Sequence, residues 1–155
     1  MSKKLAIIAS KGTLDWAYPP FILASTAAAL GYEVTIFFTF YGLTLLKKDL
    51  SGLKISPLGN PAMPMPLPIP VIAQVLPGLE SAATLMMKRK LKTKGVASVE
   101  ELRNLCLEAG VRLIACQMTV DLFDFKQEDF IEAIESGGAA TFFEFAGEAD
   151  VSLFI

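Results

Sequence analysis

The side chains best suited to covalent chemistry in this 155-residue sequence are two cysteines, and the chain contains no histidine. Without imidazole, Ser-His and Cys-His nucleophile pairs are excluded, as are zinc sites that need a histidine ligand. Two cysteines in unlike surroundings cannot supply a thiolate zinc cage either. The composition therefore favours the chemistry of a single thiol, and we expect neither a metal nor a cofactor.

Cys116 is the candidate nucleophile, because it ends the apolar run in "VRLIACQMTVDLF", residues 111–123. The carboxyl ends of parallel strands are where ligands and reactive groups collect. Backbone donors of a following turn or helix would favour the thiolate, whereas Asp121 would oppose it. Met118, Thr119 and Asp121 are the expected neighbours of the sulfur. The alternatives are a cysteine that only packs and neighbours that only form a turn.

Cys106 shares a helical face with apolar residues. Val99, Leu102 and Ala109 lie at spacings of seven, four and three residues from it. This pattern predicts a small side chain in the core. A disulfide with Cys116 is the less favoured alternative.

The loop after the first predicted strand, "SKGTLD" at residues 10–15, lacks the recognised phosphate-binding patterns. Its single glycine matches neither G-x-G-x-x-G nor a Walker loop. An ordinary turn between strand and helix is the favoured interpretation, and an anion-binding loop is the alternative.

Strands are predicted at 4–10, 33–40, 111–116 and 151–155, each a short apolar run. A first helix, with Asp15 as its cap and Pro19 or Pro20 in its first turn, should end at Gly31. A short amphipathic segment follows at 42–48. Further helices are predicted at 80–92, 98–110 and 126–138, and 139–145 fits a strand or a helix. Ser98, Glu101 and Gly110 give the 98–110 helix a capping box and a stop. This alternation predicts a parallel sheet covered by helices on both faces.

Residues 55–79 contain seven prolines and no charged side chain. So many prolines argue against a membrane-spanning helix, because freed carbonyls would lack partners in hydrocarbon. We expect an extended Pro- and Met-rich flap, covered by its own domain, by another subunit or by a membrane surface.

The bulk composition predicts one domain over residues 1–155, with 53% apolar residues and a mean hydropathy of +0.50. A net charge of −2, without interleaved basic and aromatic residues, argues against nucleic-acid binding. Five of the fourteen basic residues fall in 88–94. Such a run forms either a solvated face or a contact for a membrane surface, a membrane protein or another acidic partner. Two cysteines and no recognisable signal peptide favour the cytoplasm.

Four segments together resemble the DsrE/DsrF-like (YchN-like) family of sulfur carriers, in its single-domain branch. They are "FFTFYGLTLLKK", the stretch ending in "MMKRK", "GVRLIACQMTVDLF" and "GGAATFFEFAGEADVSLFI". The resemblance implies a three-layer α/β/α flavodoxin-like sandwich with a mostly parallel sheet of about five strands. It also implies that Cys116 carries a persulfide sulfur between donor and acceptor proteins in the cytoplasm, as a stoichiometric carrier or a sulfurtransferase. A homo-oligomer is expected.

Two other classes of function are compatible with the sequence. One is a flavodoxin-like module that binds a small ligand or nucleotide, with Cys116 merely packed. The other is an adaptor that contacts a membrane protein through residues 88–94 and the flap.

Overall fold

A five-stranded sheet forms the centre of the chain in the computed structural model, which describes residues 1–56, 72 and 75–155. All four strand pairings are parallel, in the order β4-β3-β2-β1-β5. The strands are β1 (Lys4–Ala9), β2 (Glu33–Phe38), β3 (Arg112–Cys116), β4 (Glu135–Gly137) and β5 (Val151–Phe154). The prediction of an α/β fold with about five strands is confirmed.

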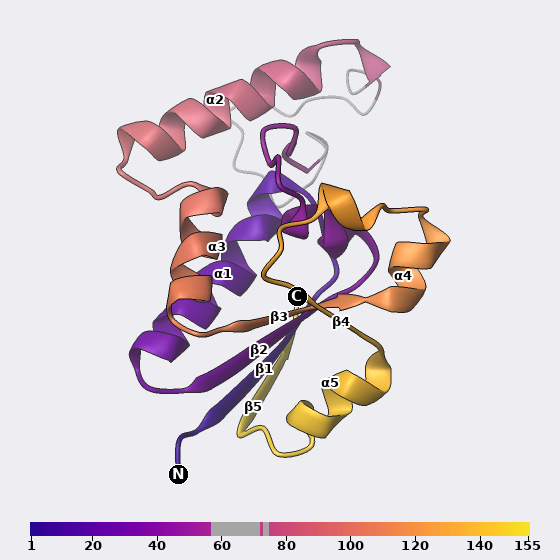
Figure 1. Ribbon diagram of the computed structural model, residues 1–155. Helices are drawn as coiled ribbons and strands as arrows, with labels where there is room; N and C mark the ends of the chain where they lie inside the picture. Colours follow the sequence, from indigo (N-terminus) through magenta and orange to yellow (C-terminus); the bar gives the residue numbers. More distant parts are fainter. Residues whose placement is uncertain (57–71, 73–74) are drawn as a thin grey trace.

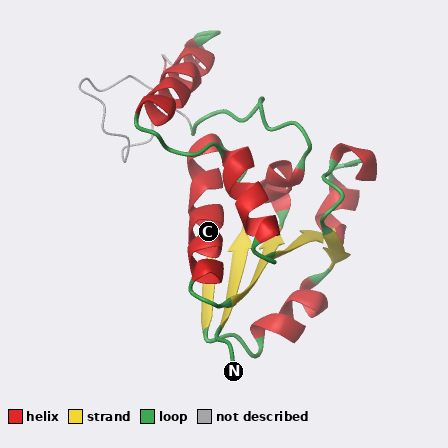
Figure 2. Ribbon diagram, turned by 60° about the vertical axis from the view of Figure 1, so that its left-hand side comes forward, coloured by secondary structure: helices red, strands yellow, loops and turns green. Residues whose placement is uncertain are grey.

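Helices cover both faces of this sheet (Figures 1 and 2). The α-helices are α1 (Leu14–Ala29), α2 (Leu79–Thr93), α3 (Val99–Glu108), α4 (Gln117–Leu122) and α5 (Ala139–Ala146), and the 3-10 helices are η1 (Phe40–Leu46) and η3 (Gln127–Asp129). Helices α1 and α3 pack together on one face, and α5 covers the other. The result is the expected three-layer sandwich.

The main core lies between the sheet and α1 with α3. Ile7, Ile36 and Leu113, from the three central strands, are almost completely buried there. Phe21 from α1 packs against Phe38 from β2, with ring centroids 5.9 Å apart. Strands buried on both faces read as continuous apolar runs, which is why the sequence indicated them clearly.

Helix α3 begins and ends as the sequence predicts. Ser98 Oγ accepts a hydrogen bond from Glu101 N at 3.1 Å, and Glu101 Oε2 accepts one from Ser98 N at 2.6 Å. Gly110 follows with φ +79°, and Gly31 follows α1 with φ +84°. Glycine adopts this left-handed conformation without the steric penalty of a Cβ, so both glycines end their helices.

Helix α1 begins two residues earlier than predicted, at Leu14, with Thr13 in the N-cap position. Pro19 and Pro20 therefore lie inside the helix rather than in its first turn, and Asp15 is not the cap. Burial explains the difference. Leu14 and Ala17 share the buried face of Phe21, so packing stabilises the turn that precedes the prolines.

The helix predicted at 126–138 is wrong. That segment forms only the short η3, and then β4 adds to the sheet beside β3. Phe130 is 2% exposed and forms an antiparallel bridge with Lys47, while Ile131 N donates to Leu46 O at 3.0 Å. These contacts override the local helix propensity of the segment. The next segment, left open between strand and helix, is α5.

The predicted flap at about 55–79 falls mostly on residues 57–71, 73 and 74, outside the described residues. At its ends, Ile55 is buried and Leu79 begins α2. Among the described residues, no helix is both long and apolar enough to span a membrane.

Candidate functional site

Cys116 is the last residue of β3 and the N-cap residue of α4. Its sequence position therefore places it at the carboxyl edge of the sheet, as predicted. Gly137 is its register partner on β4. Alternate residues of a strand face opposite sides, and Cys116 lies with Ile114 on the side covered by α5.

The side chain of Cys116 is only 5% exposed. It belongs to a small apolar cluster with Phe37, Ile114, Phe142 and Phe145. The rings of Phe37 and Phe142 lie 5.3 Å apart, which joins β2 to α5 in this cluster. A reagent therefore reaches the sulfur only when part of this apolar cover moves.

Thr119 is completely buried and connects α4 to the end of β2. Its Oγ1 lies 3.3 Å from Thr39 Oγ1, and it accepts a hydrogen bond from Phe40 N at 3.3 Å. Thr119 thus fixes the first turn of α4, the helix that begins at Cys116.

Asp121 is exposed and accepts a hydrogen bond from Gln117 Nε2 at 2.8 Å. Gln117 Oε1 in turn accepts one from Ser136 Oγ of β4. This chain of three polar side chains runs along the outside of α4 and joins it to the edge strand. The carboxylate is therefore engaged with Gln117.

Met118 is 65% exposed, so it is the apolar member of the three predicted neighbours that an approaching molecule can contact. Phe40, Tyr41 and Phe123 form an aromatic cluster at the same edge, with Tyr41 stacked on Phe123 at 5.8 Å. Phe40 has φ +47°, a conformation that costs a bulky residue free energy. These three aromatic side chains are partly exposed, so an apolar surface lies near α4.

The sequence interpretation missed Thr39, Gln117 and Ser136, which hold α4 in place. The sequence did contain a signal for Thr39, because this residue directly follows an apolar run that forms a buried strand. Cys116 was identified by the same signal, since it ends such a run. Ser136 gave no such signal, since its strand was predicted as helix.

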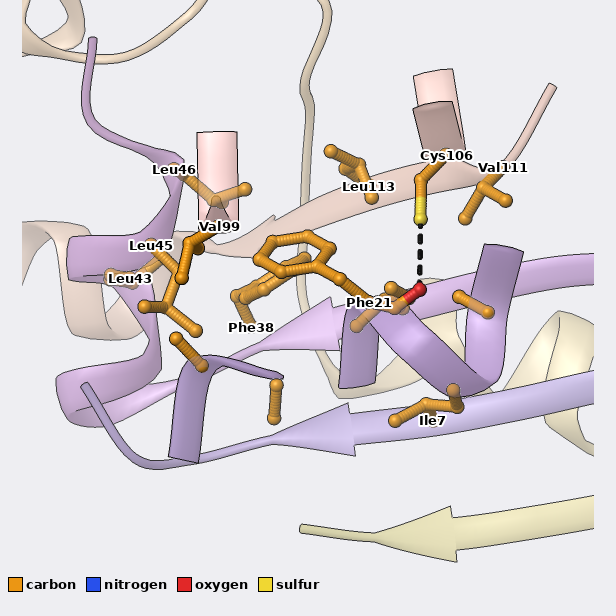
Figure 3. Close-up of a cluster of buried hydrophobic side chains, with 14 of the residues drawn as sticks. Ile7, Phe21, Phe38, Leu43, Leu45, Leu46, Val99, Cys106, Val111 and Leu113 are labelled. Atoms are coloured by element: carbon orange, nitrogen blue, oxygen red, sulfur yellow. Dashed lines mark hydrogen bonds between the residues drawn. The ribbon is translucent and has the colours of Figure 1, made fainter. Parts of the chain in front are cut away.

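Cys106 is a core residue, as predicted (Figure 3). It is completely buried, and its Sγ donates a hydrogen bond to Phe21 O at 3.4 Å. Burial raises the pKa of this thiol from 9.0 to about 11. Both cysteines are free, so the alternative of a disulfide between them is wrong.

A large hollow of about 1080 Å³ lies between α2, α3 and the loop at residues 48–53. Its lining mixes lysines with glutamates, and Cys116 is not among the residues that form it. Within the described part of the chain, histidine, cysteine, aspartate and glutamate side chains form no group of three or more placed to hold a metal ion. Neither feature adds chemistry to the thiol.

The chain belongs to the DsrE/DsrF/DrsH-like family, whose sequence profile matches residues 1–154. It is 66% identical over 157 aligned residues to the sulfur carrier protein DsrE2 of Allochromatium vinosum, covering 99% of this chain and 98% of that protein. It is 30% identical over 158 residues to the uncharacterized protein YrkE of Bacillus subtilis, with the same coverage.

Two solved structures share the fold. The ychN protein from E. coli aligns over 100% of both chains, with a TM-score of 0.55 and 11% identity. MTH1491 from Methanobacterium thermoautotrophicum, a protein of unknown function, aligns over 98% of this chain and 99% of its own, with a TM-score of 0.50 and 11% identity. At this identity the likeness concerns the fold alone.

Proposed function

We propose that this protein is a cysteine persulfide sulfur carrier in which Cys116 accepts and passes on sulfane sulfur. The observation that carries the proposal is the 66% identity, over nearly the full length of both chains, to a protein named as a sulfur carrier. The position of Cys116 supports it, because this cysteine ends a central strand and begins a helix. Cys106 is buried in the main core and serves packing.

The transfer needs a thiolate and a donor persulfide. The Cys116 thiolate attacks the terminal sulfur of R–S–SH, the donor S–S bond breaks, and R–S⁻ leaves while Cys116–S–SH forms. Delivery to an acceptor thiolate repeats the same exchange in the opposite sense. Sulfur moves without an external oxidant or reductant. The thiolate of Cys116 suffices for this chemistry, without a histidine or a metal ion.

The apolar cover over Cys116 fits a carrier that must protect its cargo. An exposed persulfide or thiolate is readily oxidised, and burial under α5 lowers access to oxidants. A donor protein that docks at the carboxyl edge must displace part of this cover before sulfur can move. Met118, Thr119 and Asp121 are the proposed neighbours: Met118 contacts the incoming partner, and the other two hold α4 in place.

The test is sulfur loading followed by mass spectrometry. The purified protein is incubated with inorganic polysulfide or with a sulfur-loaded rhodanese, alkylated with iodoacetamide and weighed intact. We expect the wild type to gain the mass of one sulfur atom, removable by dithiothreitol. Cys116→Ser should lose the gain, whereas Cys106→Ser should retain it.

Two outcomes contradict the proposal. Equal loading of the Cys116→Ser and Cys106→Ser variants would show that neither cysteine is specific. A folded wild type that takes up no sulfur from either donor would remove the carrier function. Circular dichroism of each variant separates loss of folding from loss of chemistry.

We also propose that the protein forms a homo-oligomer in the cytoplasm. Phe143 and Phe154 are 67% and 74% exposed, and β5 is an edge strand of the sheet. Exposed aromatic side chains beside an open edge favour pairing with another subunit. Multi-angle light scattering should give a mass above the 16.7 kDa of one chain, and Phe154→Ser should lower it. A monomer at micromolar concentration would contradict this.

The basic run at residues 88–94 covers the last two turns of α2 and its C-cap residue, Lys94. Lys88 donates a hydrogen bond to Ser51 O at 2.8 Å, whereas Arg89, Lys90, Lys92 and Lys94 are exposed. We propose that these four side chains contact a membrane surface or a membrane protein. Flotation with anionic liposomes that disappears in a variant with four Gln substitutions would support this. Equal flotation of the variant would contradict it.

A further inference from the structure

A second hollow, of about 370 Å³, lies beside the loop that follows β1. Its walls come from that loop and the start of α1 (Lys11, Thr13, Trp16), from η1 (Tyr41, Thr44) and from Ser56. The sulfur chemistry proposed for Cys116 does not use any of them.

The position of this hollow is one that the fold favours for ligands. The hollow lies between the segments that follow the neighbouring strands β1 and β2. It is therefore at the carboxyl edge of the sheet, where open parallel sheets bind their ligands. Ser10 N donates to Ile155 O at 2.8 Å, which ties the ends of β1 and β5 together.

Two glycines allow the walls to come close. A Cβ at Gly12 would overlap Thr44 Oγ1 and Tyr41 O, and a Cβ at Gly42 would overlap Ala9 O. Thr44 Oγ1 donates to Gly12 O at 3.5 Å, which joins η1 to the loop, and to Tyr41 O at 2.8 Å within η1. The two segments are therefore packed backbone against backbone, which fixes the two walls of the hollow relative to each other.

The lining combines one cation with two aromatic rings. Lys11 Nζ lies 3.3 Å from the centroid of the Trp16 ring, and Tyr41 contributes the other ring. Thr13 and Ser56 hydroxyls lie 3.2 Å apart at the rim. Asp15 accepts hydrogen bonds from Ser56 N at 2.8 Å and from Ser56 Oγ at 2.7 Å, so an anion is favoured at Lys11 rather than at Ser56.

We propose that this hollow binds a small organic anion with a single aromatic ring, the ring against Trp16 and Tyr41 and the anionic group on Lys11. The volume is near the lower end of the range for ligand pockets, which fits a ligand of this size. A charged hydrogen bond fixes the anionic end, and the aromatic walls bury the ring. The site is separate from Cys116.

Trp16 supplies the measurement, because it is the single tryptophan of the chain. Phenyl phosphate is titrated into the protein while tryptophan fluorescence is recorded. We expect a saturable change, with phenol and inorganic phosphate binding at least about tenfold more weakly, since each lacks one half of the recognised chemistry. No saturable change with phenyl phosphate would overturn the proposal.

Lys11→Met should weaken phenyl phosphate binding by about tenfold or more. Lys3→Met is the matched control, because Lys3 also lies over a ring, 6.0 Å from the centroid of Tyr32 and outside the hollow. Isothermal titration calorimetry of Trp16→Phe, which keeps a ring, checks that binding does not depend on the reporter. Equal affinity of Lys11→Met and wild type, or equal affinity for inorganic phosphate and phenyl phosphate, would overturn the assignment. Sulfur loading of Cys116 should be unchanged in Lys11→Met.

Discussion

Thr39 and Thr119 place their hydroxyl oxygens 3.3 Å apart and so join the end of β2 to the first turn of α4. Thr119 Oγ1 also accepts a hydrogen bond from Phe40 N at 3.3 Å. Because α4 begins at Cys116, this contact sets the position of the helix that carries the proposed nucleophile. The strained conformation of Phe40 is held by the same contact.

Replacing Thr119 by valine should lower the free energy of unfolding by about 1 to 3 kcal/mol. The substitution keeps the shape of the side chain but leaves Thr39 Oγ1 and Phe40 N without this partner. Urea denaturation followed by circular dichroism measures the change. Thr26→Val is the control, because Thr26 is exposed on α1. Equal stability of the two variants would mean that the Thr119 hydrogen bonds contribute nothing.

The free energy of unfolding should decrease as the pH rises through the alkaline range, because the Cys106 thiol is buried. Burial raises its pKa from 9.0 to about 11 in the folded chain, so between these values the unfolded chain loses the proton while the folded chain keeps it. Folding stability is therefore fully present below pH 9 and declines toward pH 11, by about 2 to 3 kcal/mol from this group.

Cys106→Ala isolates this effect, because other groups titrate in the same range. The difference in unfolding free energy between wild type and variant should shrink as the pH rises from 9 to 11. Chemical denaturation at several pH values gives that difference. A difference that stays constant over this range would show that the buried thiol ionises as readily in the folded chain as in the unfolded one.

The central strands could be predicted from the sequence because they are buried on both faces. Ile7, Ile36 and Leu113 belong to apolar runs with clear ends, and Ser98 with Glu101 marks the start of α3 by a local hydrogen-bond pattern. The segment at 126–138 could not be predicted in this way. Its strand β4 is stabilised by pairing with β3, whose residues are distant in the sequence. The residues of the segment have helix propensity, so a local pattern predicts a helix instead.

The site was predictable in its location but not in its contacts. The end of an apolar run gave the position of Cys116, since strand ends are visible in the sequence. That Thr119 bonds Thr39, and that Gln117 connects Asp121 with Ser136, depends on how neighbouring strands lie side by side. The 5% exposure of Cys116 depends on α5, which follows it by more than twenty residues.

Ser56→Ala should raise the pKa of Asp15. Burial by itself would raise that pKa, but the hydrogen bonds from Ser56 Oγ and Ser56 N outweigh it and hold the pKa below its usual 3.8. In the wild type this carboxylate stabilises the fold above its unfolded pKa, and the contribution is lost as the pH falls through the depressed value. The variant should therefore lose less stability on acidification.

Carbon-detected NMR titration of the Asp15 carboxyl measures this pKa directly. Ser25→Ala is the control, because Ser25 lies on the same helix but donates to Ile22 O. A pKa of Asp15 that is the same in Ser56→Ala and in the wild type would show that the Ser56 hydroxyl does not contribute to the shift.

Access to Cys116 should depend on Phe142. The two side chains share the apolar cluster beneath α5, and the Phe142 ring packs against Phe37 at 5.3 Å. Phe142→Leu removes part of this cover, so alkylation of Cys116 by iodoacetamide should become faster relative to alkylation of Cys106. The variant should also lose roughly 1 to 3 kcal/mol of stability, because a smaller side chain leaves unfilled volume.

Phe130→Leu is the matched control, because Phe130 is also buried but belongs to the cluster on the opposite face of the sheet. Mass spectrometry of quenched time points gives both alkylation rates for each variant. If cover by α5 limits access, only Phe142→Leu changes the ratio of the Cys116 rate to the Cys106 rate. Equal acceleration of both cysteines in both variants would mean that reagents reach Cys116 through global unfolding, and an α5 cover would then play no part in sulfur transfer.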